Sequence, residues 1–292
     1  MTQNVSGHYT PRTSSWRRIA TATWGQANDP TIYGTLEVDA GPALAYIEDL
    51  RARTGVHVTI THVVCKALAD TLAAHPECNA YVRRGRVYER EEVDIFVLVA
   101  VSSKERGDAR GDQRRAARRQ GQRADLTGVK IEDADHRSML EIARATMRGA
   151  TEVRRGNDRA FGPVKRLLRA MPPGVIRRAL DLFEWLQYDL NLDLSRVGVP
   201  KDSFGCAIVT SMGMMGIQHA FAPLIPMARL TCLVAVGAVE ERPVARDGEV
   251  VIRPVLPITA TFDHRIIDGF QAAQLSKSFR ERMRDPAKYF GS

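Results

Sequence analysis

The pattern of hydrophobic and polar positions in the first part of the chain predicts strands mixed with helices. Residues 32–40 (IYGTLEVDA) alternate with a period of two, as a half-buried strand does. Residues 41–55 carry apolar side chains at helical spacing and end on Gly55, a common residue type just beyond a helix. Residues 56–76 begin with a strand-like pattern and become helical before Pro76.

The middle of the chain continues this mixture. Residues 93–101 (VDIFVLVAV) form a continuous apolar run, which is typical of a buried strand, and residues 126–131 (LTGVKI) return to a strand pattern. Residues 135–150 are amphipathic at helical spacing. The polar stretch between the two apolar runs is therefore expected to be a loop that joins two strands.

Residues 161–194 have a different character. They predict two amphipathic helices divided at Pro172 and Pro173, because proline interrupts a helix. One face of the second helix would carry Val175, Ala179, Leu182, Leu186 and Leu190. Such a stripe indicates packing against the core or against another subunit, and a membrane surface or a partner helix is the alternative.

The last third of the chain predicts strands and hairpins, with a strong turn signal in RDGE at residues 246–249. Residues 258–262 alternate as a strand that leads to Asp263, and residues 270–283 follow with helical periodicity. His264 therefore lies at a junction between a strand and a helix. A histidine between charged residues in such an apolar segment suggests chemistry as well as structure.

Composition limits the class of protein. The chain has 292 residues, of which 44% are hydrophobic and 26% charged, so it can bury a large core as one sizeable domain or two small ones. It contains no run of eighteen or more apolar residues and no apolar segment of a secretory signal near its start, so a cytoplasmic protein is expected. The four cysteines lie far apart in the sequence, which indicates reduced, buried thiols.

The net charge of +8 is concentrated in one place. Residues 104–123 hold eight basic and three acidic residues, and they contain no aromatic residue that could stack on a base. A solvated loop is therefore expected here, and a nucleic-acid surface is the less favoured interpretation.

Two interpretations of the His264 segment do not involve catalysis. Asp268 can cap the following helix, with Gln271 completing a capping box. His264 and Asp268 could bind a metal ion if both lay on a helix, but Gly269 indicates a turn and no third ligand is near in the sequence. No metal site is expected.

The segment FDHRIIDG, residues 262–269, resembles the His-x-x-x-Asp-Gly motif of the dihydrolipoamide acyltransferase core of 2-oxo acid dehydrogenase complexes, whose fold is shared with chloramphenicol acetyltransferase. A single short motif is weak, but four further segments match in the same order. They are residues 58–80, 128–143, 209–217 and 233–244.

The resemblance implies a chloramphenicol acetyltransferase-like α/β fold, a mixed sheet packed by helices, in one domain spanning residues 1–292. It implies a homotrimer or a higher oligomer of trimers, in which neighbouring subunits supply the two halves of each active site. The implied reaction moves an acyl group from acyl-coenzyme A to a thiol such as dihydrolipoamide, carried in trans by a separate lipoyl-bearing protein. Transfer to a hydroxyl or amine of a small molecule, a non-catalytic scaffold, and a basic binder of nucleic acid or anionic membrane are the alternatives.

The resemblance also assigns roles. His264 is the expected general base, since neutral imidazole can take a thiol proton near neutral pH. Thr210 is the expected donor to the oxyanion, with Ser211 as the alternative. Asp268, which precedes Gly269 of the motif, is expected to orient the site by pairing with Arg17, although the neighbouring Arg18 competes for this role.

Two features depart from the family pattern. No lipoyl or subunit-binding domain is apparent ahead of the core, so a stand-alone core is expected. Residues 104–123, a basic loop, and residues 161–194, an amphipathic helical segment, are predicted insertions.

Overall fold

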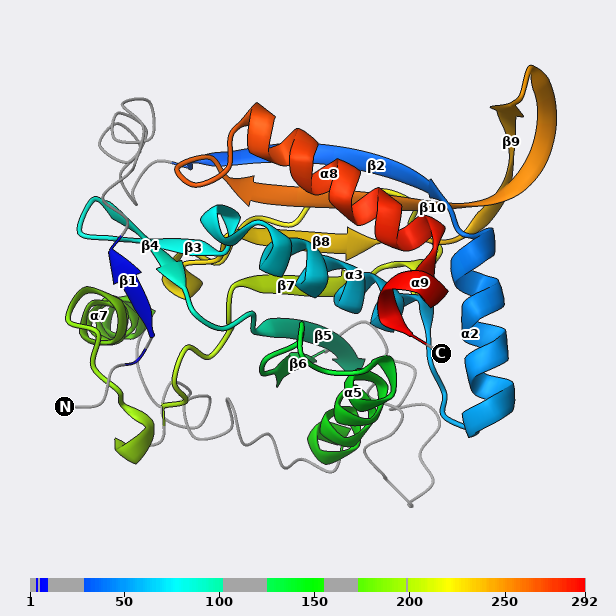
Figure 1. Cartoon of the computed structure of the whole chain (residues 1–292). Coiled ribbons are helices and arrows are strands. Elements are labelled where there is room, and N and C mark those ends of the chain that lie inside the picture. The colour runs from blue at the N-terminus through cyan, green and yellow to red at the C-terminus, as the bar shows by residue number, and fades with distance from the viewer. Residues whose placement is uncertain are drawn as a thin grey trace, which may run out of the picture.

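The computed structural model describes residues 4, 6–9, 29–101, 125–154, 173–197 and 199–291. Its centre is a seven-stranded sheet in the order β2-β10-β8-β7-β5-β6, in which β9 pairs only with β10 (Figure 1). The strands are β2 Thr31–Asp39, β5 Ile95–Val101, β6 Asp125–Ile131, β7 Ala207–Ser211, β8 Cys232–Val236, β9 Glu240–Arg246 and β10 Glu249–Asp263. Strands β5, β7 and β8 run parallel and the other pairs are antiparallel, so the sheet is mixed.

Helices cover one face of this sheet. Helices α5, α3 and α8 pack side by side across it, and α2 and the short α9 pack at their edge (Figure 1). Their bounds are α2 Gly41–Thr54, α3 Ile60–Ala74, α5 Met139–Arg154, α8 Gly269–Arg284 and α9 Pro286–Phe290. Alternation along β7 sends Val209 into the main core under the helices and Ile208 into a smaller core on the opposite face.

A smaller sheet, in the order β1-β4-β3, stands beside the main one. It consists of β1 Gly7–Tyr9, β3 Ala80–Arg83 and β4 Arg86–Arg90. Elsewhere in the chain, short 3₁₀ turns occupy Pro76–Cys78, Ser195–Val197, Gly213–Met215 and Pro226–Ala228. Helix α7, Pro173–Glu184, continues into a π-helical turn at Trp185–Asp189 and lies close to the small sheet (Figure 1).

Buried polar contacts fix the end of α7 to the body. Arg229 pairs with Glu184 at 2.8 Å and with Asp189 at 3.0 Å, and the Tyr188 hydroxyl donates to Asp202 at 2.9 Å. Asp202 in turn accepts from Arg90 at 3.2 Å. The C-terminal part of the predicted helical insertion is thus an integral part of the domain.

The predicted stripe on this segment is only partly covered. Val175 is 48% and Leu182 is 53% exposed, while Ala179, Leu186 and Leu190 are half-buried. The side of the helix that carries Tyr188 contacts the body instead. Residues 161–172 of the predicted insertion, and all of residues 104–123, lie outside the described residues.

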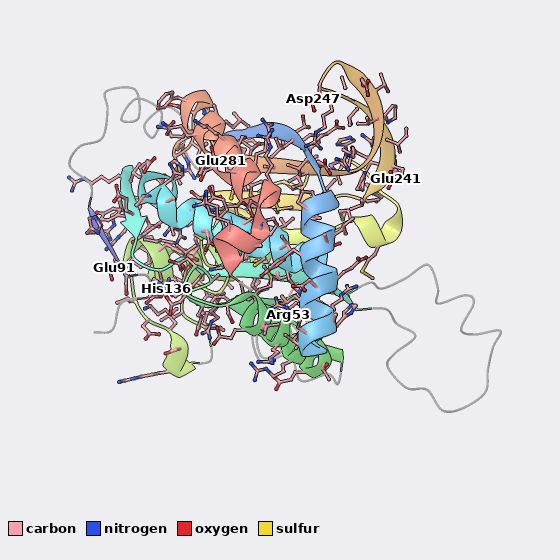
Figure 2. All side chains as sticks on the ribbon, turned by 45° about the vertical axis from the view of Figure 1, so that its right-hand side comes forward. Arg53, Glu91, His136, Glu241, Asp247 and Glu281 are labelled. Carbon is pink, nitrogen blue, oxygen red and sulfur yellow. The ribbon has the colours of Figure 1, made fainter. Side chains whose placement is uncertain are left out.

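The predicted fold class is confirmed, and most local predictions agree with the structure. The RDGE signal is a two-residue turn with Asp247 at φ 52° and Gly248 at φ 85°, and it closes the hairpin of β9 and β10. Figure 2 shows Glu241 and Asp247 on this projecting hairpin. Residues 56–59 are an exception: the expected strand is a short connection into α3, in which Val58 is fully buried.

Among the residues that the structure describes, no helix combines the length and apolarity needed to cross a membrane.

Candidate active site

The His264 turn joins β10 to α8. The backbone N–H groups of Ile266 and Ile267 both donate to the Asp263 carbonyl at 2.9 Å, and the Asp263 N–H donates to the Thr231 carbonyl at 3.0 Å. The His264 N–H donates to the carbonyl of Pro30, next to β2, at 2.7 Å. These bonds hold the turn against two neighbouring segments of the chain.

The half-buried His264 ring has a defined hydrogen-bond partner. Its Nδ1 lies 2.9 Å from the carbonyl oxygen of Ile267. Because a carbonyl oxygen can only accept, Nδ1 must carry the hydrogen, and a neutral ring then has its lone pair on Nε2. The geometry therefore presents His264 as a base through Nε2.

Asp268 and Gly269 begin the helix that follows. The Asp268 carboxylate accepts from Phe270 N at 2.9 Å and from Gln271 N at 3.3 Å, and Gln271 Oε1 accepts from Asp268 N at 3.1 Å. This is the capping box expected from the sequence. Since α8 begins only at Gly269, His264 and Asp268 do not lie one turn apart on a helix. Arg17 lies outside the described residues, so its pairing with Asp268 stays a prediction.

Thr210 and Ser211 end strand β7. Thr210 is 9% exposed and Ser211 is half-buried. The 3₁₀ turn that follows exposes Met214 at 87% and Met215 at 60%. The candidate oxyanion donors are therefore followed directly by a turn with two exposed methionines.

Strand register separates Thr210 from His264. Thr210 is level with Ala235 in β8, which is level with Thr259 in β10, five residues before His264. At about 3.3 Å per residue and 4.8 Å between strands, the two residues are about 19 Å apart. One subunit therefore does not bring the candidate base and oxyanion donor together.

One acidic cluster among the described residues has carboxylates close enough to share a metal ion. Oxygens of Glu92, Asp94 and Asp133 lie within 4.8 Å of one another. However, Lys130 Nζ donates to Asp94 at 2.9 Å, and Asp94 also accepts from the backbone N–H of Asp133 at 3.0 Å. A lysine ammonium therefore already provides the positive charge, and the cluster is a structural ion pair.

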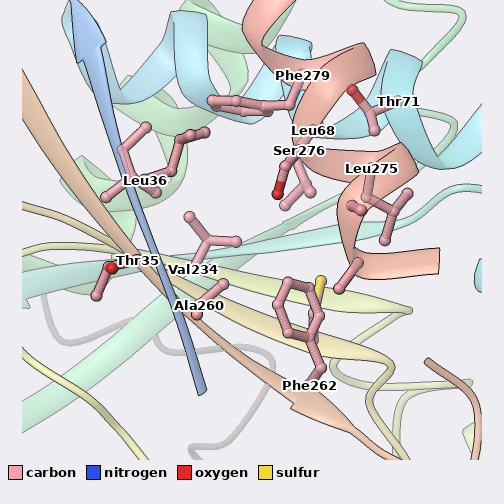
Figure 3. Close-up of a pocket in the computed structure, with 15 residues that line it drawn as sticks. Thr35, Leu36, Leu68, Thr71, Val234, Ala260, Phe262, Leu275, Ser276 and Phe279 are labelled. Carbon is pink, nitrogen blue, oxygen red and sulfur yellow. The ribbon is translucent and has the colours of Figure 1, made fainter. Parts of the chain in front are cut away.

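A cavity of about 200 Å³ lies between α8, α3 and the sheet (Figure 3). Its walls include Phe262 of β10, two residues before His264, and Leu275 and Phe279 of α8. None of the described residues lining it is charged, so it does not suit the phosphates of coenzyme A.

Comparison with known proteins identifies the family. Residues 10–106 and 202–291 match the family of 2-oxoacid dehydrogenases acyltransferase (catalytic domain). The chain belongs to this family. Nearly all of the two predicted insertions, 104–123 and 161–194, falls in the unmatched gap between these ranges.

One relative is the dihydrolipoyllysine-residue acetyltransferase component of the pyruvate dehydrogenase complex of Zymomonas mobilis, 35% identical over 96% of this chain. The chain spans 50% of that protein, or about half the length of such curated relatives.

Solved structures show the same fold. The cubic core of the pyruvate dehydrogenase multienzyme complex has a TM-score of 0.63 at 19% identity, covering 94% of this chain and 88% of that one. A chloramphenicol acetyltransferase has a TM-score of 0.52 at 13% identity, covering 95% of this chain and all of its own.

Sequence reasoning missed part of the His264 turn. It identified His264, Asp268 and Gly269, but it did not include Asp263 and Arg265, whose side chains pair across the histidine. The signal was present as opposite charges at positions 263 and 265.

Proposed function

We propose that the chain is an acyltransferase that moves an acyl group between coenzyme A and a thiol, with dihydrolipoamide as the first acceptor to test. The observation that carries the proposal is the His264 ring, which the Ile267 carbonyl holds with its lone pair on Nε2. Membership of the acyltransferase family and the similarity to a dihydrolipoyllysine-residue acetyltransferase support it.

The proposed reaction begins when His264 Nε2 takes the thiol proton of the acceptor. The thiolate sulfur then forms a bond to the thioester carbonyl carbon, and the carbonyl oxygen becomes an oxyanion. The Thr210 hydroxyl donates a hydrogen bond to this oxyanion. The intermediate collapses as the bond to the coenzyme A sulfur breaks, and that sulfur takes the proton back from His264.

The separation of Thr210 from His264 supports an active site between subunits. We propose a homotrimer, or a higher oligomer of trimers, in which Thr210 of one subunit faces His264 of the next. The exposed Met214 and Met215, in the turn that follows Thr210, provide apolar surface that a neighbouring copy would cover. A separate lipoyl-bearing protein is the proposed source of the acceptor.

The decisive experiment is a panel of acyl-coenzyme A donors assayed for release of free coenzyme A with dihydrolipoamide as acceptor. Release that depends on the acceptor and on His264 supports the proposal and identifies the acyl group. Release only with hydroxyl or amine acceptors would redirect the function to small-molecule acylation. No release with any donor, from a folded oligomer, would favour a non-catalytic scaffold.

A further inference from the structure

We infer that Asp263 and Arg265 are positioning residues that fix which ring nitrogen of His264 carries the hydrogen. The inference rests on the proposed function, in which His264 Nε2 is the base. It adds two residues to the site, neither of which touches a reacting atom.

The contact between the two side chains is a bidentate ion pair that spans His264. The Arg265 guanidinium donates to Asp263 through Nη2 at 2.7 Å and through Nε at 3.0 and 3.2 Å, and the Arg265 backbone N–H donates to the same carboxylate at 2.9 Å. Asp263 is 3% and Arg265 is 8% exposed. The bond from the Arg265 backbone N–H to the Asp263 side chain is an Asx turn, so the chain turns at His264.

A buried ion pair is a poor way to gain stability. The free energy needed to remove two charges from water is about as large as the free energy gained from their attraction. Apolar side chains of similar volume often stabilise a protein equally well. Its value here is the conformation that it specifies. The fork of Arg265 matches the two oxygens of Asp263 in one orientation, which fixes the backbone on both sides of the histidine.

The pair is connected to the imidazole through the Asp263 main chain. The Asp263 carbonyl accepts from the N–H of Ile267, and the Ile267 carbonyl is the partner of His264 Nδ1. Asp263 therefore determines where that acceptor stands. If the turn loosened, the ring could rotate or exchange tautomers, and the lone pair would leave Nε2 for part of the time.

The test combines tautomer measurement with kinetics. In Arg265→Met, nitrogen-15 NMR of labelled histidine should show His264 changing from a single Nδ1–H tautomer to a mixture. The turnover number should fall by about ten- to a hundredfold, with KM for the acyl donor within about twofold, because a small misplacement of a reacting group costs rate more than binding. Arg265→Lys should recover part of the loss, since an ammonium can make one of the two contacts.

Two further variants separate positioning from folding. The double change Asp263→Asn with Arg265→Met leaves no unpaired buried charge, so it should fold and still show the tautomer mixture. The control is Lys66→Met, which breaks another buried pair, Lys66 with Asp70 at 2.8 Å. Asp70 contacts Arg282, about 21 Å along α8 from Asp268, so this variant should lose stability while the His264 tautomer and turnover stay unchanged.

The outcomes distinguish this inference from the proposed function. A folded Arg265→Met or double variant that keeps a single Nδ1–H tautomer overturns the positioning role, whatever its turnover. A tautomer mixture with unchanged turnover supports the positioning role of Asp263 and Arg265. The same result would contradict the proposed function, because it shows that His264 is not the base. An equal tautomer change in Lys66→Met would also overturn the inference, because the effect would then be general loosening.

Discussion

The two ends of the central sheet that carry the candidate residues are built differently. At the end of β10, a buried ion pair, several backbone hydrogen bonds and a capping box hold His264 within one chain. At the end of β7, Thr210 is followed by a turn that leaves Met214 and Met215 exposed. The chain itself therefore fixes the position of the candidate base, whereas it leaves apolar side chains exposed beside the candidate oxyanion donor.

The largest expected effect comes from removing the base. His264→Ala should lower the turnover number by about 10²- to 10⁴-fold at nearly unchanged affinity for the acyl donor, because it removes proton transfer but few binding contacts. Steady-state kinetics with dihydrolipoamide would measure this, with thermal melting as a check of folding. Turnover near that of the wild type in a folded variant would show that His264 is not the catalytic base.

Removing the candidate oxyanion donor at the end of β7 should cause a somewhat smaller loss of turnover. Thr210→Ala should lower turnover by about a hundredfold, since one donor to an oxyanion contributes roughly that much. The matched control is Ser211→Ala, which should stay within a few-fold of the wild type. The opposite ranking would assign the oxyanion contact to Ser211.

Subunit mixing tests whether the two ends meet across an interface. When His264→Ala and Thr210→Ala subunits are combined in equal amounts, every mixed trimer contains one intact site. Random mixing should then restore about a quarter of wild-type activity, while each variant alone stays nearly inactive. An absence of recovery in verified mixed trimers would show that the ends do not form a shared site.

Asp268 lies near His264, at the start of α8, and it has two possible roles. A single substitution distinguishes them. If it only caps α8, Asp268→Asn should be nearly silent, because asparagine caps about as well as aspartate. If it also pairs with Arg17, the change should lower turnover and cost about 3 to 5 kcal/mol through an unpaired buried charge. Kinetics and denaturant unfolding of this variant decide between them, with Asp285→Asn, at the cap of α9, as the control.

How much could be predicted from the sequence depends on the range of each interaction. The strand before Asp263, the helix after it and the Asp268 cap are set by neighbouring residues, and all were predicted. The distance between Thr210 and His264 depends on strand order and register, which no local pattern specifies. The ion pair of Asp263 with Arg265 depends on burial in the turn, so its charges alone did not reveal it.

A second histidine, His62, should make the stability of the fold depend on pH. Burial, with smaller effects of His57 and Arg51, lowers the pKa of His62 from 6.5 to about 4, and Nδ1 of His62 accepts from the Thr59 N–H at 3.1 Å. At a pH between about 4 and 6.5, His62 therefore binds a proton in the unfolded chain but not in the folded chain. The free energy of unfolding should fall as the pH drops from 6.5 toward 4, by up to about 3 kcal/mol.

Denaturant unfolding across this pH range would measure the effect. His62→Gln retains a side-chain acceptor but cannot titrate. The slope of its unfolding free energy against pH should therefore decrease by the contribution of about one proton in this range. An unchanged pH dependence in that variant would assign the effect to other groups.

The smallest expected effect concerns residues 104–123, which lie outside the described part of the chain. Strand β5 runs parallel to β7, so the connection that contains these residues leaves the sheet at the Thr210 end. Replacing them with a short Gly-Ser linker should leave assembly and turnover with dihydrolipoamide unchanged, because loop length contributes little to stability. If the replacement instead abolished transfer to a protein-borne lipoyl group while sparing dihydrolipoamide, the basic residues would be a docking surface, and the Thr210 end would be completed by two partners, another subunit and the acceptor protein.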